Sequence, residues 1–214
     1  MGVNLKKGQG VNLCKSEFDL SEVTIGLGWD VAEVQPGFFG KLLGKKEEEY
    51  DLDAVAFLLN EQGLVADLGK VEGGKSTLSD GDVIYFGSMQ HRSGCISLTG
   101  DNRTGAGDGD DEQIIVNLNH LPDGYQKVVF IVQIYQGVEK GQNFSKINNA
   151  FIRAVDKKGT EMVRFDLSGE PAYSNFHSIK FAELERHGTE WKFSAVGTPY
   201  STDNFVHILR EYIQ

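Results

Sequence analysis

The chain has 214 residues, a formal net charge of −10 and 40% hydrophobic residues, a composition typical of a soluble globular protein. This acidic balance argues against a nucleic-acid-binding surface, because a phosphate backbone attracts basic side chains. Two cysteines without a CxxC pair indicate neither a disulfide framework nor a zinc site. We expect a cytoplasmic protein, since no stretch has the apolar character of a signal peptide or a membrane span.

The first predicted elements are strands. The tetrapeptide Gly-Val-Asn-Leu occurs at 2–5 and again at 10–13, and its alternation predicts two short strands around a glycine turn. Alternate apolar residues over 23–30 predict a strand that ends on a carboxylate, and the apolar run 54–59 predicts a buried one. Between them, residues 35–49 combine glycines, an apolar centre and a charge run, which predicts a long exposed loop.

An acidic stretch over 100–113 is the most distinctive feature of the sequence. Residues 101–112 contain five carboxylates, three glycines and a single cation, Arg103. Such a loop repels itself unless a cation neutralises it, and its oxygen-only side chains suit a hard metal ion. Calcium fits best because it accepts several carboxylates in flexible geometry, whereas magnesium prefers to keep its water. A solvated acidic turn is the alternative.

The acidic stretch does not follow the EF-hand pattern, although Asp101 and Glu112 are spaced as its first and twelfth positions. The third position is Arg103, the sixth is Ala106 where a glycine is needed, and the flanks read as strands. The sequence therefore predicts a calcium loop on a β scaffold.

The rest of the chain predicts further strands and one helix. Strands are expected over 83–86, 95–98, 114–118 and 125–135, and hairpins over 150–167 and 179–196. Near the end, Phe205, Ile208, Leu209 and Tyr212 fall on one helical face, with Asp203 as the expected N-cap. We predict one all-β domain over 1–214, an antiparallel two-sheet β-sandwich with a short C-terminal helix.

Several motifs, taken in order, resemble the TerD family of bacterial tellurium-resistance and stress-response proteins. The resemblance covers nearly the whole chain, and the acidic stretch is its most specific part. It is carried by Gly26-Leu27-Gly28-Trp29-Asp30, Asp51-Leu52-Asp53-Ala54, the stretch 100–112, Gln142-Asn143-Phe144, 164–168 and 186–193. It implies a cytoplasmic two-sheet β-sandwich that binds calcium, usually two ions, and has no established enzymatic activity. The loop at about 35–49 is longer than in the short members, which indicates a variant branch.

The resemblance assigns the metal ligands residue by residue. The candidates are Asp30, Asp51, Asp53, Asp101, Asn102, Asp108, Asp110, Asp111 and Glu112. Eight carboxylates are too many for one calcium ion, which uses about three or four, so they suit two neighbouring ions.

The remaining titratable residues are assigned no site. Asp80, Asp82 and Asp123 are predicted to be turn residues, and the five histidines show no metal-ligand spacing. The sequence shows no nucleophile–base pair or phosphate loop, so we predict no catalytic residue and no enzyme. A calcium-dependent enzyme or a protein that binds a phosphate compound or nucleotide is the alternative function.

The apolar part of the 35–49 loop indicates what the chain contacts. Phe38, Phe39, Leu42 and Leu43 form an apolar cluster flanked by lysines, and leaving it in water is unfavourable. We expect it to fold onto its own sandwich, or else to contact a second copy, another stress-response protein or, through residues 37–46, a membrane surface.

Overall fold

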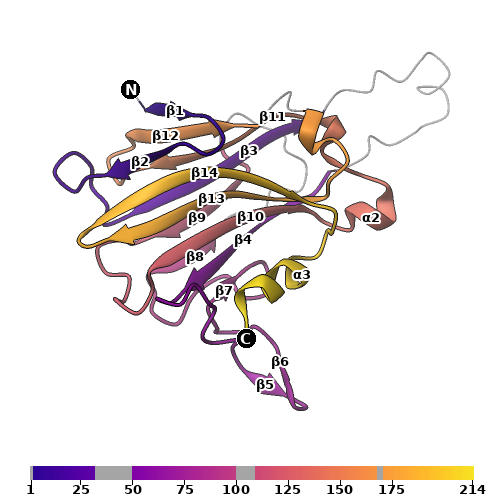
Figure 1. The fold of residues 1–214 in the computed structure, drawn as a ribbon, viewed down its shortest axis with the longest axis horizontal. Coiled ribbons are helices and arrows are strands. Elements are labelled where there is room, and N and C mark those ends of the chain that lie inside the picture. Colours follow the sequence, from indigo (N-terminus) through magenta and orange to yellow (C-terminus); the bar gives the residue numbers. More distant parts are fainter. Residues whose placement is uncertain (1, 32–49, 100–108, 168–170) are drawn as a thin grey trace.

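The computed structural model describes residues 2–31, 50–99, 109–167 and 171–214, which form two six-stranded sheets stacked as layers (Figure 1). Sheet A has the order β1 (Val3–Leu5), β12 (Glu161–Asp166), β11 (Ile147–Val155), β3 (Val23–Val31), β9 (Glu112–Val116), β8 (Ile96–Thr99). Sheet B has the order β2 (Gly10–Leu13), β14 (Glu190–Tyr200), β13 (Ser178–His187), β10 (Lys127–Ile134), β4 (Leu52–Leu59), β7 (Val83–Ile84). The described pairings are antiparallel except that of β1 with β12, which is parallel. The predicted mainly β, sandwich-like fold is confirmed.

The core lies between the two sheets because the strands alternate apolar and other residues. In β3, Ile25, Leu27 and Trp29 point inward and are at most 3% exposed. In β4, Leu52, Ala54, Ala56 and Leu58 belong to the same core, so their neighbours in sequence lie on the opposite face of sheet B. The alternation read from the sequence therefore fixes which side chains face inward.

A second apolar cluster covers the outer face of sheet B. Val55 and Phe57 of β4 pack there with Phe205, Ile208 and Leu209 of helix α3 (Phe205–Leu209), which is followed by a 3₁₀ turn (Arg210–Tyr212). The predicted helical face is thus confirmed. The predicted cap is wrong, because the Asn204 side chain caps α3 by accepting the N–H of Val206.

The short elements are the least well predicted from sequence. The hairpin β5 (Val71–Glu72) and β6 (Lys75–Ser76), which projects from one end of the sandwich (Figure 1), was not predicted, nor was the one-turn helix α2 (Gly137–Lys140). Two further 3₁₀ turns cover Phe144–Lys146 and Pro171–Tyr173. Within the described ranges, none of the helices has the length and apolar character needed to cross a membrane.

Candidate functional site

The end of β3 and the starts of β4 and β9 meet at one edge of the sandwich, which we call the acidic edge. Six of the predicted ligands belong to it: Asp30, Asp51, Asp53, Asp110, Asp111 and Glu112. The other three, Asp101, Asn102 and Asp108, lie outside the described residues. The hydrogen bonds of β9 show how three distant segments are held together here.

Asp111 and Glu112 connect β9 to the other two strands. The Trp29 N–H donates to Asp111 Oδ2 at 2.9 Å, and the Asp111 N–H donates to the Leu27 carbonyl at 2.7 Å. Glu112 points between the sheets, where its Oε2 accepts the Ala54 N–H at 2.9 Å. Asp111 is 8% and Glu112 4% exposed. These two buried carboxylates therefore tie β3 of sheet A and β4 of sheet B to the end of the acidic stretch.

Asp110 is directed instead to the outer face of sheet A. Its Oδ1 accepts the Nε–H of Arg153 at 2.8 Å, and its Oδ2 accepts from Gln113 Nε2 at 3.3 Å. The hydrogen bond and charge of Asp110 raise the pKa of the Arg153 guanidinium, so the guanidinium stays protonated. Both oxygens of Asp110 thus have protein partners.

The remaining three candidates lie around the acidic edge on different faces. Asp30 is exposed and accepts from Asn149 Nδ2 at 2.6 Å. Asp53 lies on the outer face of sheet B, where Gln133 Nε2 donates to it at 3.2 Å, and Asp51 directly precedes β4. Of the six described candidates, Asp111 and Glu112 are therefore the two that are buried and hydrogen-bonded to the backbones of β3 and β4. Among the residues that it describes, no three His, Cys, Asp or Glu side chains form a ready metal cage.

The chemistry of the acidic edge nevertheless fits a hard cation. Its side-chain donors are oxygens, and buried carboxylates in proteins are paired with cations or coordinate metals. Each of the two buried carboxylates has one oxygen hydrogen-bonded to a backbone N–H, which orients the group. The acidic stretch, with five carboxylates over 101–112, ends at these two residues.

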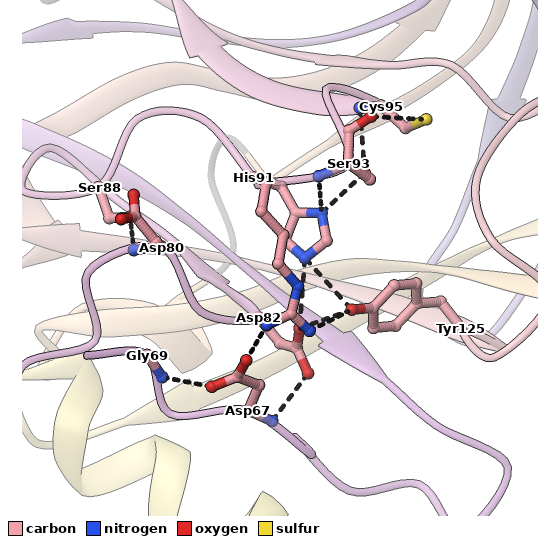
Figure 2. A network of polar contacts seen from close by, with 10 residues as sticks. Asp67, Gly69, Asp80, Asp82, Ser88, His91, Ser93, Cys95 and Tyr125 are labelled. Carbon is pink, nitrogen blue, oxygen red and sulfur yellow. Dashed lines mark hydrogen bonds and ion pairs between the residues drawn. The ribbon is translucent and has the colours of Figure 1, made fainter. Parts of the chain in front are cut away.

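A second polar cluster, shown in Figure 2, was not predicted from the sequence. Its centre is Asp82, which is fully buried. Asp82 Oδ1 accepts from the Tyr125 hydroxyl at 2.7 Å and from His91 Nε2 at 3.2 Å, and Oδ2 accepts the Asp67 N–H at 2.9 Å. Arg92 pairs with Asp67 and approaches Asp82 Oδ1 at 3.5 Å. Asp82 lies in the bend directly before β7, where a turn residue was predicted, but its place at the centre of a buried network was not predicted.

The proton of His91 is placed by its neighbours. The Ser93 N–H donates to His91 Nδ1 at 3.1 Å, so Nδ1 is an acceptor and the hydrogen is on Nε2, directed at Asp82. Burial raises the pKa of the Tyr125 hydroxyl, and its hydrogen bond to Asp82 raises it further, so Tyr125 stays a donor. Every partner thus donates to one buried carboxylate.

The contact between Ser93 Oγ and His91 Nδ1 at 2.7 Å resembles a nucleophile–base pair. The nearest backbone N–H groups, which an oxyanion hole would need, are already used. The Gly94 N–H donates to the His91 carbonyl, and the Cys95 N–H donates to Ser93 Oγ. We interpret the cluster as structural: it joins four segments, at residues 67, 82, 91–93 and 125.

Comparison with known proteins gives consistent results along the whole chain. The family model described as the TerD domain matches residues 1–212. The tellurium resistance protein TerX of Serratia marcescens is 62% identical over 213 residues, covering 100% of both chains. The stress response protein SCP2 of Bacillus subtilis is 40% identical, also covering 100% of both chains. General stress protein 16U of Bacillus subtilis is 36% identical, covering 94% of this chain and 92% of its own.

Solved structures share the fold. A homologue of the telluride resistance protein TerD from Streptomyces coelicolor superposes with a TM-score of 0.59 at 19% identity, covering 87% of this chain and 94% of that one. A protein of unknown function gives a TM-score of 0.62 at 22% identity, covering 91% and 98%. At these identities the likeness concerns the arrangement of the strands.

Proposed function

The chain belongs to the TerD family of tellurium-resistance and stress-response proteins, and from this premise we propose that it is a cytoplasmic calcium-binding interaction module. The observation that supports calcium most directly is the pair Asp111 and Glu112. These are buried carboxylates at the end of the acidic stretch, and each is hydrogen-bonded to a different strand end.

In this proposal Asp111 and Glu112 hold calcium together with Asp101, Asn102 and Asp108 of the acidic stretch. Asp30, Asp51 and Asp53 complete a set that serves two ions. The ions supply positive charge that offsets the crowded carboxylates, and they cross-link the acidic stretch to the ends of β3 and β4. Because a folded chain is needed to bring these segments together, calcium binding stabilises the fold.

Calorimetric titration of the metal-free protein tests this function. We expect about two calcium ions per chain, with magnesium and zinc unable to displace them because the ligands are hard oxygens. Glu112→Gln should lower the calcium affinity, whereas Glu72→Gln on the exposed β5–β6 hairpin should leave it unchanged. A parent chain that takes up no calcium would refute the proposal.

We further propose that the module acts by binding a partner rather than by catalysis. The candidate contact is the apolar loop 37–46, which lies outside the described residues and is proposed from its sequence alone. Deleting 37–44 should leave the calcium affinity intact and abolish self-association or binding to vesicles that contain anionic lipids. Sedimentation and vesicle pelleting of the deletion beside the parent test this. Turnover of phosphoester or nucleotide substrates that depends on calcium would instead support an enzyme.

A further inference from the structure

The end of the acidic stretch packs against the outer face of β3 at Gly26 and Gly28, and we call this contact surface the seat. Gly26 and Gly28 lie on this face, because the residues between and beside them point into the core. A Cβ atom on Gly26 would lie 2.1 Å from Asp110 Oδ2, and one on Gly28 would lie 2.8 Å from the Gly109 carbonyl oxygen. The segment Gly109–Asp110 therefore rests directly on the backbone of β3, in space that any side chain would fill.

Arg153 closes this seat from the neighbouring strand. In the register of β11 with β3, Arg153 stands directly opposite Gly26, so its side chain passes over the bare glycine to reach Asp110. Asp110 is only 2% exposed there, and Arg153 is itself held by Glu161 Oε2 at 3.2 Å. A half-buried, charge-assisted hydrogen bond of this kind fixes position more firmly than an exposed ion pair.

The three successive acids then take three separate places. Asp110 is fixed on the outer face, Asp111 at the end of β3, and Glu112 between the sheets at Ala54. Because Asp110 is held in place, it sets the direction in which the backbone continues to Asp111 and Glu112. A displaced Asp110 would shift the carboxylates of Asp111 and Glu112 with it.

We propose that Asp110 anchors the acidic stretch instead of binding metal, and that Arg153 is a positioning residue that sets calcium affinity by holding it. The inference rests on the proposed calcium site. It changes the expected role of Asp110, one of the nine candidate ligands, from a metal ligand to an anchor of the acidic stretch.

A double-mutant cycle tests the anchor, using calcium titration of Arg153→Met, Asp110→Asn and the double variant. Each single change should weaken calcium binding by about tenfold, within the range of coupling between contacting residues. The double variant should be no weaker than either single one, and the number of bound ions should not change. Arg153→Lys should restore part of the affinity, because a lysine keeps the charge.

Arg164→Met is the matched control for this cycle. Arg164 stands opposite Arg153 in β12 on the same face and stacks on the Phe151 ring at 3.7 Å, and it pairs with Asp166 and Glu161. Its loss should lower thermal stability without changing calcium affinity. Additive effects of Arg153→Met and Asp110→Asn, or the loss of one ion in Asp110→Asn alone, would overturn the inference.

A metal-free measurement separates failure of the seat from failure of the proposed function. In EGTA, Gly26→Ala should push Asp110 off β3 and speed hydrogen exchange of the Trp29 amide, which is bonded to Asp111. Gly124→Ala is the control, because a Cβ there meets no atom within 4 Å and its φ is not positive. Unchanged Trp29 exchange in Gly26→Ala would refute the seat. A parent that binds no calcium would instead refute the site and the role of Arg153 in affinity, whatever the exchange shows.

Discussion

Two of the regions that bury carboxylates in the described structure, the Asp82 network and the acidic edge, are stabilised differently. Asp82 is surrounded by donors from four residues, Asp67, His91, Arg92 and Tyr125, so a single negative charge is satisfied by the protein. At the acidic edge, several carboxylates come from one short stretch, and the backbone fixes one oxygen of Asp111 and one of Glu112.

The comparison shows that hydrogen-bond geometry and charge are separate requirements of a buried acid. Around Asp82, donors meet both requirements, because the guanidinium of Arg92 lies beside the carboxylate. At the acidic edge, backbone N–H groups orient two of the carboxylates, and residues 101–112 hold five acids and one arginine, so acidic side chains outnumber basic ones in this stretch. We therefore expect the first region to be insensitive to calcium and the second to depend on it.

The largest expected effect concerns the centre of the protein-satisfied region. Asp82→Ala leaves the Tyr125 hydroxyl, His91 Nε2 and the Asp67 N–H without their buried acceptor. Removal of one partner from such a network typically costs about 3–5 kcal/mol. Urea unfolding measures this loss, which should be the same in calcium and in EGTA. Asp123→Ala is the control, since that side chain is fully exposed and its loss should cost at most about 0.5 kcal/mol.

Removal of calcium should have the next largest effect and act at the other region. A ligand that binds only the folded chain, present at 100 times its dissociation constant, adds about 3 kcal/mol to stability. Thermal melting in millimolar calcium and in EGTA should therefore give clearly separated midpoints. Indistinguishable midpoints would mean that the acidic edge needs no metal and that the contrast between the regions is wrong.

A third carboxylate, Asp156, tests the contribution of backbone donors alone. It is buried in the turn between β11 and β12 and accepts N–H bonds from Thr160, Asp19 and Lys158. Burial would raise the pKa of this carboxyl, but the hydrogen bonds outweigh it and hold the pKa below its ordinary value of 3.8.

Because the folded pKa of Asp156 is lowered, its stabilisation is present above pH 3.8 and is lost as pH falls through the lower, folded value. At neutral pH, Asp156→Ala should cost about 1–3 kcal/mol through the lost acceptor. Denaturation over a falling pH series should show the gap between variant and parent narrowing only in the acid range. A gap that stays constant down to strong acid would assign the loss to packing instead.

The smallest expected effect concerns Ser93 at the rim of the Asp82 network. Ser93→Ala removes the part-buried Oγ contact with His91 Nδ1 and the Oγ acceptor of the Cys95 N–H, but the backbone N–H of the same residue still donates to His91 Nδ1. The loss should be about 1–2 kcal/mol, the net value of two hydrogen bonds. If unfolding of Ser93→Ala instead matched that of Asp82→Ala, the network would depend on its rim and not on the buried acid.

The sequence predicts what depends on neighbours along the chain. Alternation predicted β3, a continuous apolar run predicted β4, and β-branched and aromatic residues predicted β10, because each pattern reports which faces are buried. Both long hairpins were predicted as well. The Asp82 network was missed because the partners of Asp82 lie up to 43 residues from it, and a lone histidine carries no spacing signal. At the C-terminal helix, Asp203 and Asn204 are equally good caps by residue type, and only the backbone shows that Asn204 serves.

The acidic edge was predicted in part. The family resemblance named Asp111 and Glu112, and the structure brings them together with the ends of β3 and β4. Residue spacing alone could not separate the three acids at 110–112, because their different directions follow from the strand partners. The glycines at 26 and 28 were the available signal, since small residues on an exposed strand face leave room for another segment.

The repeated Gly-Val-Asn-Leu affects whether the sheet edges of the molecule can pair with strands of other chains. The first copy forms β1 at the border of sheet A, paired in parallel with β12, and the second forms β2 at the border of sheet B, paired antiparallel with β14 (Figure 1). The two strands of this short N-terminal arm thus cover one edge of each sheet. A chain trimmed before Cys14 would expose the backbones of β12 and β14 together, and unshielded borders invite strand exchange and fibrous aggregation. A side chain in place of Gly2 would push the same arm away, because a Cβ at this position would lie 2.8 Å from the Glu161 carbonyl oxygen.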